Sequence, residues 1–140
     1  MTQEDKELLI KDLCARLPYG VKMNHIADDE INPLILIGIA RSMITLAGNG
    51  GFASVDIEDY KPYLFPLSSM TEEQQEEFDR IYADDMQVVA NNLKNRLDGK
   101  PYETNLGHYR HIDWLNANHF DYRGLIPKGI AIDATGLNIY

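Results

Sequence analysis

Residues 71–98 read TEEQQEEFDRIYADDMQVVANNLKNRLD, and this stretch decides the fold. Large apolar and aromatic residues recur along it at steps of four, four, three, four and four, namely Phe78, Tyr82, Met86, Val89, Leu93 and Leu97. This spacing places all of them on one face of an α-helix. Thr71 and Gln74 form a capping box at its start, and Gly99 followed by Pro101 ends it. We therefore predict an amphipathic helix over residues 71–98 that packs across a sheet with its apolar face buried and its acids in solvent.

The length of this helix is itself informative. At 1.5 Å per residue it extends roughly 42 Å, whereas a compact chain of this size has a diameter of only about 37 Å. The helix therefore spans the whole body, breaks near Ala83-Asp84-Asp85, or projects toward a partner.

A second amphipathic helix is predicted over residues 2–16. Thr2 and Asp5 resemble a capping box, Leu9, Leu13 and Leu17 recur at i+4, and Pro18 stops the pattern. Cys14 lies beside this apolar stripe, so we expect a buried thiol rather than a reactive one.

Between residues 19 and 66 the pattern changes to short β-branched or alternating runs separated by turn residues. The expected strands lie near residues 21–25, 34–40, 43–46, 54–57 and 63–65. Gly48-Asn49-Gly50-Gly51 supplies the turn chemistry of a hairpin. These runs predict a small antiparallel sheet of four or five strands with barrel-like curl.

After the long helix we expect one short helix around Ile112 and Leu115 that ends near Asn118, and a last strand at Ile130-Ala131-Ile132. The chain has no linker or repeat. The predicted fold is thus a single α+β domain over residues 1–140, with an N-terminal helix, a small antiparallel sheet, one long amphipathic helix and a short C-terminal helix.

The net charge of -9 is unevenly distributed. Residues 56–85 contain ten acids against Lys61 and Arg80, a local balance of -8. Such a surface repels phosphate backbones, so direct nucleic-acid binding is not expected. The N-terminus does not resemble an export signal, and the longest apolar run, residues 33–40, is far shorter than the roughly 20 residues of a membrane span. We expect a cytoplasmic protein that has no membrane partner and needs no cofactor.

Histidines and carboxylates gather late in the chain as His108, His111, His119 and Asp121. These residue types are common ligands of zinc and non-haem iron. A metal-dependent enzyme using this cluster is one hypothesis, although the three-residue spacing of His108 and His111 in a loop fixes no common face. Capping or surface histidines are the simpler interpretation. No Gly-x-Ser-x-Gly motif or other covalent catalytic signature is present.

The leading hypothesis is a non-enzymatic protein that binds another protein. Its contact residues would lie on the acidic start of the long helix and on the aromatic segment after it, namely Glu72, Glu73, Glu76, Asp79, Trp114, Tyr122 and Arg123. Aromatic residues and arginine are typical of interface hot spots, and they are equally typical of a small core. The acids also fit helix-dipole logic. A DNA-mimic inhibitor of a nucleic-acid enzyme is a second alternative, and homo-oligomers are compatible with the same residues.

Three phrases carry a resemblance to other proteins. They are LCARLPYGV at residues 13–21, KPYLFPLSSMTEE at residues 61–73, and WLN to HFDYRGLI between residues 114 and 126. They resemble a group of short uncharacterised proteins of gut anaerobes and of the phages and mobile elements that those bacteria carry. This resemblance implies no activity or catalytic residues, and it suggests by association an accessory protein that acts on host or element proteins.

Overall fold

The fold is α+β and falls into two compact units. The computed structural model describes residues 1–101 and 109–140. One unit comprises residues 1–69 and 119–140, and we call it the sheet unit. The other comprises residues 70–118 and is called the helical unit. Whether residues 1–140 fold as a single domain stays a prediction.

The sheet unit begins with α1 (Gln3–Arg16), which confirms the predicted first helix. The Thr2 side chain accepts a hydrogen bond from the Asp5 backbone and the Asp5 side chain accepts from the Thr2 backbone, so the capping box is present. Leu9 and Leu13 are buried, but Cys14 is exposed, so the expectation of a buried thiol is wrong. The buried face of α1 instead includes Asp12 and Arg16. Asp12 and Arg16 can be buried on this face because their opposite charges pair with each other.

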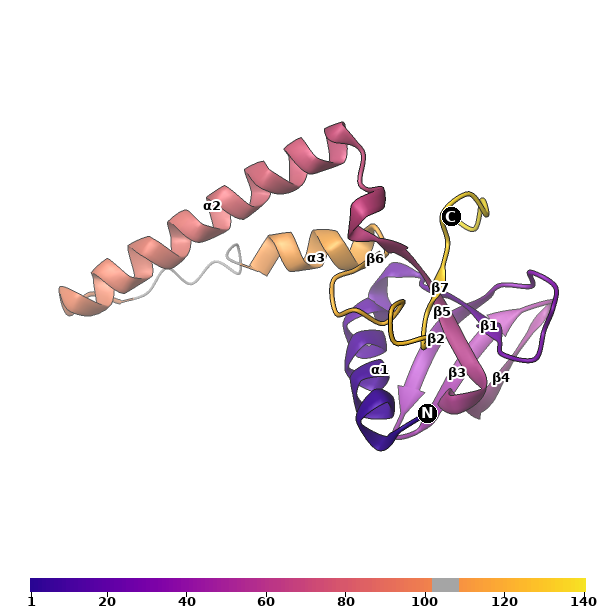
Figure 1. The fold of residues 1–140 in the computed structure, drawn as a ribbon. Coiled ribbons are helices and arrows are strands. Elements are labelled where there is room, and N and C mark those ends of the chain that lie inside the picture. Colours follow the sequence, from indigo (N-terminus) through magenta and orange to yellow (C-terminus); the bar gives the residue numbers. More distant parts are fainter. Residues whose placement is uncertain (102–108) are drawn as a thin grey trace. The chain divides into compact units, whose positions relative to one another are not determined.

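Seven strands form one mixed sheet in the order β4-β3-β2-β1-β5-β6, with β7 also paired to β5 (Figure 1). The first five strands are β1 (Lys22–His25), β2 (Leu34–Ala40), β3 (Met43–Gly48), β4 (Gly51–Asp56) and β5 (Tyr60–Pro66). They pair antiparallel, as predicted. The two-residue turn between β3 and β4 has positive φ at Asn49 (52°) and Gly50 (81°), which is the type I′ geometry that asparagine and glycine favour. Short 3-10 turns, η1 (Leu17–Tyr19), η2 (Ile57–Asp59) and η3 (Leu67–Ser69), follow α1, β4 and β5.

The predicted size and type of the sheet need correction. β6 (Phe120–Asp121) and β7 (Ile132–Asp133) add to the sheet by pairing parallel with β5. The sheet therefore has seven strands, is mixed rather than antiparallel, and is not closed like a barrel. The strand expected at residues 130–132 is confirmed in part, since β7 shares only Ile132 with it. β6 was not predicted, because two residues are too few for an alternating pattern to be visible in the sequence.

Apolar clusters lie on both faces of the sheet. The larger cluster joins α1 to the sheet through residues such as Leu13, Met23 and Leu64. The smaller cluster contains Tyr63, Ala134 and Ile139. Because neighbouring residues of a strand point to opposite faces, Tyr63 and Leu64 place the two clusters on opposite sides of β5.

The helical unit contains α2 (Glu72–Leu97) and α3 (Arg110–Ala117). α2 runs without interruption, so the sequence alternative of a break near residues 83–85 is wrong. The predicted capping box is present, since the Thr71 side chain accepts from the Gln74 backbone and the Gln74 side chain accepts from the Thr71 backbone. Among the described helices, none combines the length and apolar character that crossing a membrane would require.

Candidate protein-binding surface

The acidic start of α2 is a solvent-exposed surface. Glu72 and Glu73 occupy its first turn, where negative side chains complement the partial positive charge of the helix N-terminus. Glu76 and Asp79 are exposed as well. Because residues three and four apart share a helix face, Glu72, Glu76 and Asp79 line one side of α2. The structure thus places these sequence-predicted acids on a single element.

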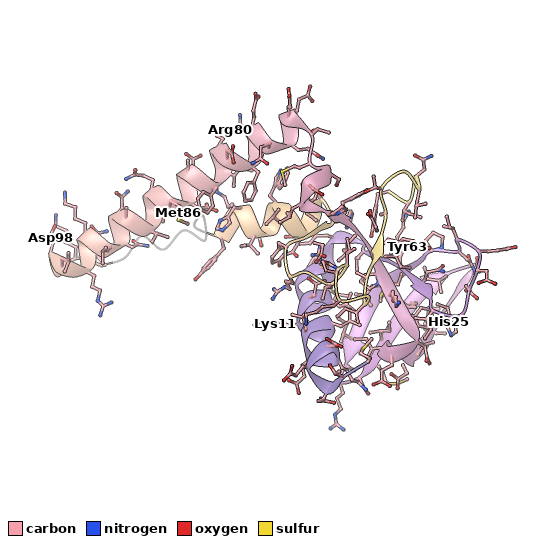
Figure 2. All side chains as sticks on the ribbon, in the orientation of Figure 1. Lys11, His25, Tyr63, Arg80, Met86 and Asp98 are labelled. Atoms are coloured by element: carbon pink, nitrogen blue, oxygen red, sulfur yellow. The ribbon has the colours of Figure 1, made fainter. Side chains whose placement is uncertain are left out.

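The apolar stripe of α2 is not the buried face that the sequence predicted. Its exposed fractions are 46% at Tyr82, 45% at Val89, 58% at Leu93 and 80% at Leu97. The only buried residue of α2 is a charged one, Asp85. The spacing identified correctly which residues share a face, and the expectation that the whole face is packed was wrong. Figure 2 labels Arg80, Met86 and Asp98 along this helix.

Among the described residues, ring contacts with α3 lie at the first two residues of the stripe. The Phe78 ring lies 5.7 Å from the Trp114 ring, and the Tyr82 ring meets the His111 ring edge to face at 5.1 Å, between centroids. At 1.5 Å per residue the eight residues of α3 extend roughly 12 Å, against about 39 Å for α2. A helix this short covers only part of the stripe, and Val89, Leu93 and Leu97 are exposed.

Asp85 joins α2 to the start of α3. Its Oδ2 accepts hydrogen bonds from the His111 backbone nitrogen at 2.8 Å and lies 2.6 Å from His111 Nδ1. Arg110 Nε lies 3.4 Å from Oδ1. Burial alone would raise the pKa of the Asp85 carboxyl, but the bonds from His111 and Arg110 outweigh it and lower that pKa below the ordinary value. Asp85 is therefore a charged acceptor for the N-terminus of α3.

The other predicted contact residues have different surroundings. Trp114 is part of the helical unit and half-buried, whereas Tyr122 and Arg123 belong to the sheet unit. The Arg123 guanidinium lies over the Tyr122 ring at 5.0 Å, and Arg123 Nε lies 3.4 Å from Asp12 Oδ1. Tyr122 and Arg123 thus tie the segment after β6 to α1, which is a structural role within the sheet unit.

The described members of the predicted histidine cluster also belong to different units, with His111 in the helical unit and His119 and Asp121 in the sheet unit. His108 lies outside the described residues, and His111 is engaged with Asp85. His119 stacks on Tyr140 at 3.6 Å between ring centroids, and both Asp121 oxygens accept backbone hydrogen bonds, from Leu125 and Ile126. Within residues 1–101 and 109–140 no group of three or more histidines, cysteines and acids is placed to hold a metal ion.

Comparison with protein families, with curated proteins and with solved structures finds no match for this chain. The surface must therefore be interpreted from its own residues. Two features of the surface were not predicted from the sequence. They are the role of Asp85 and the exposure of the distal stripe, which consists of Val89, Leu93 and Leu97. The position of Asp85 in the sequence could have identified its role. It falls three residues after Tyr82 and four before Val89, which places a charged residue on the apolar side of the helix.

Proposed function

We propose that this chain is a non-enzymatic protein that binds another protein through α2. The observation that carries the proposal is the exposed distal stripe, Val89, Leu93 and Leu97, on an unbroken helix. Exposed apolar side chains in a row are typical of interaction sites, and an amphipathic helix laid into an apolar groove is a common recognition mode. The resemblance to proteins of phages and mobile elements is compatible with an accessory role of this kind.

The charge on the same helix indicates the chemistry of the partner. Glu72, Glu76 and Asp79 lie on one side of the first turns, ahead of the exposed distal stripe. The partner we propose has an apolar groove for the distal half of α2 and basic side chains beside its acidic half. Charge pairing of this type mainly accelerates association and selects the partner, and the apolar contact supplies the affinity.

The test uses a photo-reactive amino acid at position 93 in cells of the native host. We expect a defined covalent adduct with one host or element protein, and we expect Leu97→Glu to abolish it. The matched control is the same amino acid at Gln87, which is exposed and lies about 120° around the helix from Leu93. Equal adducts from positions 93 and 87 would contradict the proposal.

Salt dependence separates this proposal from the DNA-mimic alternative. Partner capture through the apolar stripe should weaken moderately between low and moderate salt, whereas binding that depends on acids alone collapses. The mimic is supported by the exposed row Glu72, Glu76 and Asp79 alone. This row is not continued by the next acids, because Asp84 is paired with Arg110 and Asp85 is buried. The metal-enzyme alternative has no supporting observation among the described residues.

A further inference from the structure

The sheet unit carries a second surface, independent of α2, at strand β4. β4 ends the strand order, so among the described residues no strand pairs with its outer side. Its first four residues are all exposed, and Phe52 reaches 79% exposure. The backbone groups along this side are available for pairing.

The register identifies which backbone groups face outward. Ile57, just after β4, donates its backbone N–H to the Ser42 carbonyl at 2.9 Å, and Gly48 pairs with Gly51 across the hairpin turn. Backbone direction alternates along an antiparallel strand. Residues 51, 53, 55 and 57 therefore face β3, while Phe52, Ser54 and Asp56 present their N–H and C=O groups to the open side.

In the part of the chain that the structure describes, this edge lacks the usual features that prevent pairing. Natural edge strands are protected by lysine, proline, bulges or a covering segment. β4 reads GFASVD, with Asp56 as its sole charged residue, and its register with β3 is unbroken over six pairs. By contrast, the register between β2 and β3 shifts between Leu36 and Gly38. An unprotected regular edge is suited to receive another strand.

A cavity of about 270 Å³ lies beside the same edge. Its apolar lining includes Leu34, Leu46, Ala53, Val55 and Tyr60. Leu46 belongs to the larger core cluster and Leu34, Val55 and Tyr60 pack against that cluster, so the cavity is an opening at the margin of the core. It lies on the inner face of the sheet, where every second side chain of an added strand would point.

We propose that β4 binds an extended peptide segment of another protein as an additional strand. Main-chain hydrogen bonds to Phe52, Ser54 and Asp56 hold the peptide, and a bulky apolar side chain at an inward position enters the cavity and contacts its apolar lining. An outward apolar side chain packs beside Phe52. This is the strand-addition mode, in which backbone bonds give affinity and pockets give specificity.

The cavity favours such a peptide over a second copy of this chain. In a pairing of two β4 strands, the inward side chains from the partner would be Ala53 and Val55. Both side chains are small, so they would contact less of the lining of this open pocket than a leucine, methionine or aromatic side chain would. The occupant is therefore a segment with leucine, methionine or an aromatic residue at the inward position.

The test is a selection from a random peptide display library against the full chain, followed by amide NMR titration of the selected peptides. We expect peptides that alternate large apolar residues, and shifts centred on the amides of Phe52, Ser54 and Asp56. Selection of no peptide, or shifts confined to other elements, would overturn the proposal.

Two matched variants test the mode of binding. Ser54→Pro removes an outward N–H and no backbone hydrogen bond to β3, although it also removes the side-chain hydrogen bond between Ser54 and Thr45. It should weaken peptide binding about tenfold or more while the sheet stays folded. Ser54→Thr retains the N–H and should bind like the unmodified chain. Ala53→Leu fills the cavity from within and should select against peptides with bulky inward residues.

Sedimentation of the free chain completes the design. A concentration-dependent dimer that Ser54→Pro converts to monomer would show that a second copy occupies the edge, which contradicts the proposal. Leu93→Glu on α2 is the control that should leave peptide binding unchanged, because it lies in the helical unit. Equal binding by Ser54→Pro and Ser54→Thr would also contradict strand addition.

Discussion

Asp12 and Arg16 form a salt bridge within the sheet unit that has no exposed side-chain surface. Arg16 Nε lies 2.7 Å from Asp12 Oδ2, and Arg16 Nη2 also donates to the Phe120 carbonyl at 2.6 Å. Burial nevertheless raises the pKa of the Asp12 carboxyl above its ordinary value, more than the contacts with Arg16 and Arg123 lower it. The pair thus connects α1 to β6 at a considerable desolvation cost.

The desolvation cost predicts what happens when one member of the Asp12–Arg16 salt bridge is removed. Arg16→Met leaves the Asp12 carboxylate buried between the Arg123 cation and the like charge of Asp121, so the free energy of unfolding should fall by about 3 kcal/mol or more. The double variant Asp12→Leu with Arg16→Met has no buried charge and should recover most of that loss. Urea unfolding of the three chains measures both values. Equal losses in the single and double variants would refute the desolvation argument.

His119 gives a second prediction at this scale. Burial, with the charges of Arg16 and Lys22, lowers the pKa of the His119 imidazole to about 4. The unfolded chain therefore takes up this proton near pH 6.5, while the folded chain takes it up only near pH 4. The free energy of unfolding should thus fall as the pH is lowered through this window, by at most about 3 kcal/mol.

The matched variant is His119→Asn. His119 has a positive φ of 63°, which asparagine tolerates better than most residues. The variant loses the stacking on Tyr140 and should be less stable overall, but its stability should depend less on pH between 6.5 and 4. Parallel slopes for the two chains in this window would contradict the assignment.

At the level of elements, Asp85 is the residue that holds α3 against α2. Asp85→Ala removes the acceptor for the His111 N–H and leaves a helix N-terminus without its partner, at a cost of about 1–3 kcal/mol. Hydrogen exchange at the amides of α3 should accelerate by the corresponding factor, while exchange in β3 stays unchanged. Asp85→Asn keeps an oxygen acceptor and should give an intermediate rate. Unchanged α3 exchange in Asp85→Ala would contradict this role.

In contrast to Asp85, the exposed residues of the distal stripe should contribute little to stability. Leu93→Glu should change the free energy of unfolding by no more than about 0.5 kcal/mol, because the side chain is 58% exposed. Leu13→Glu places the same charge at a fully buried position of α1 and should abolish or severely reduce stability. Thermal unfolding of both variants compares them directly. A large loss of stability in Leu93→Glu would instead support the buried helix face that the sequence predicted.

The elements that could be predicted are those whose signals are local. α1 and α2 were predicted because capping boxes at Thr2 and Thr71 and the spacing of leucines lie within each helix. β6 could not be predicted, because two residues that pair with distant β5 leave no pattern. The last strand was expected at residues 130–132 and β7 lies at Ile132–Asp133, but its parallel pairing with β5 left no local signal. For the candidate site, the exposure of Glu72 to Asp79 was predictable. What covers the stripe was not, because periodicity defines a face without identifying its neighbour.

At the level of the whole molecule, the helical unit is an insertion between two stretches that build the sheet unit. Both core clusters consist of residues from 1–69 and 119–140. The Phe65 N–H donates to the His119 carbonyl at 2.8 Å, so the sheet unit brings the segments on either side of the insertion together. The cores of the sheet unit are therefore assembled from the sequence flanking the insertion.

This organisation predicts that residues 70–118 can be replaced by a flexible glycine and serine linker. About a dozen residues are needed, since β5 and β6 run parallel and require a crossover. We expect the shortened chain to unfold cooperatively and to retain the amide NMR positions of β1 to β4, because its apolar clusters are intact. The peptide-binding edge of β4 should be retained with them. A shortened chain that fails to fold would instead show that residues 1–140 are one folding domain, with α2 required by the sheet as well as by a partner.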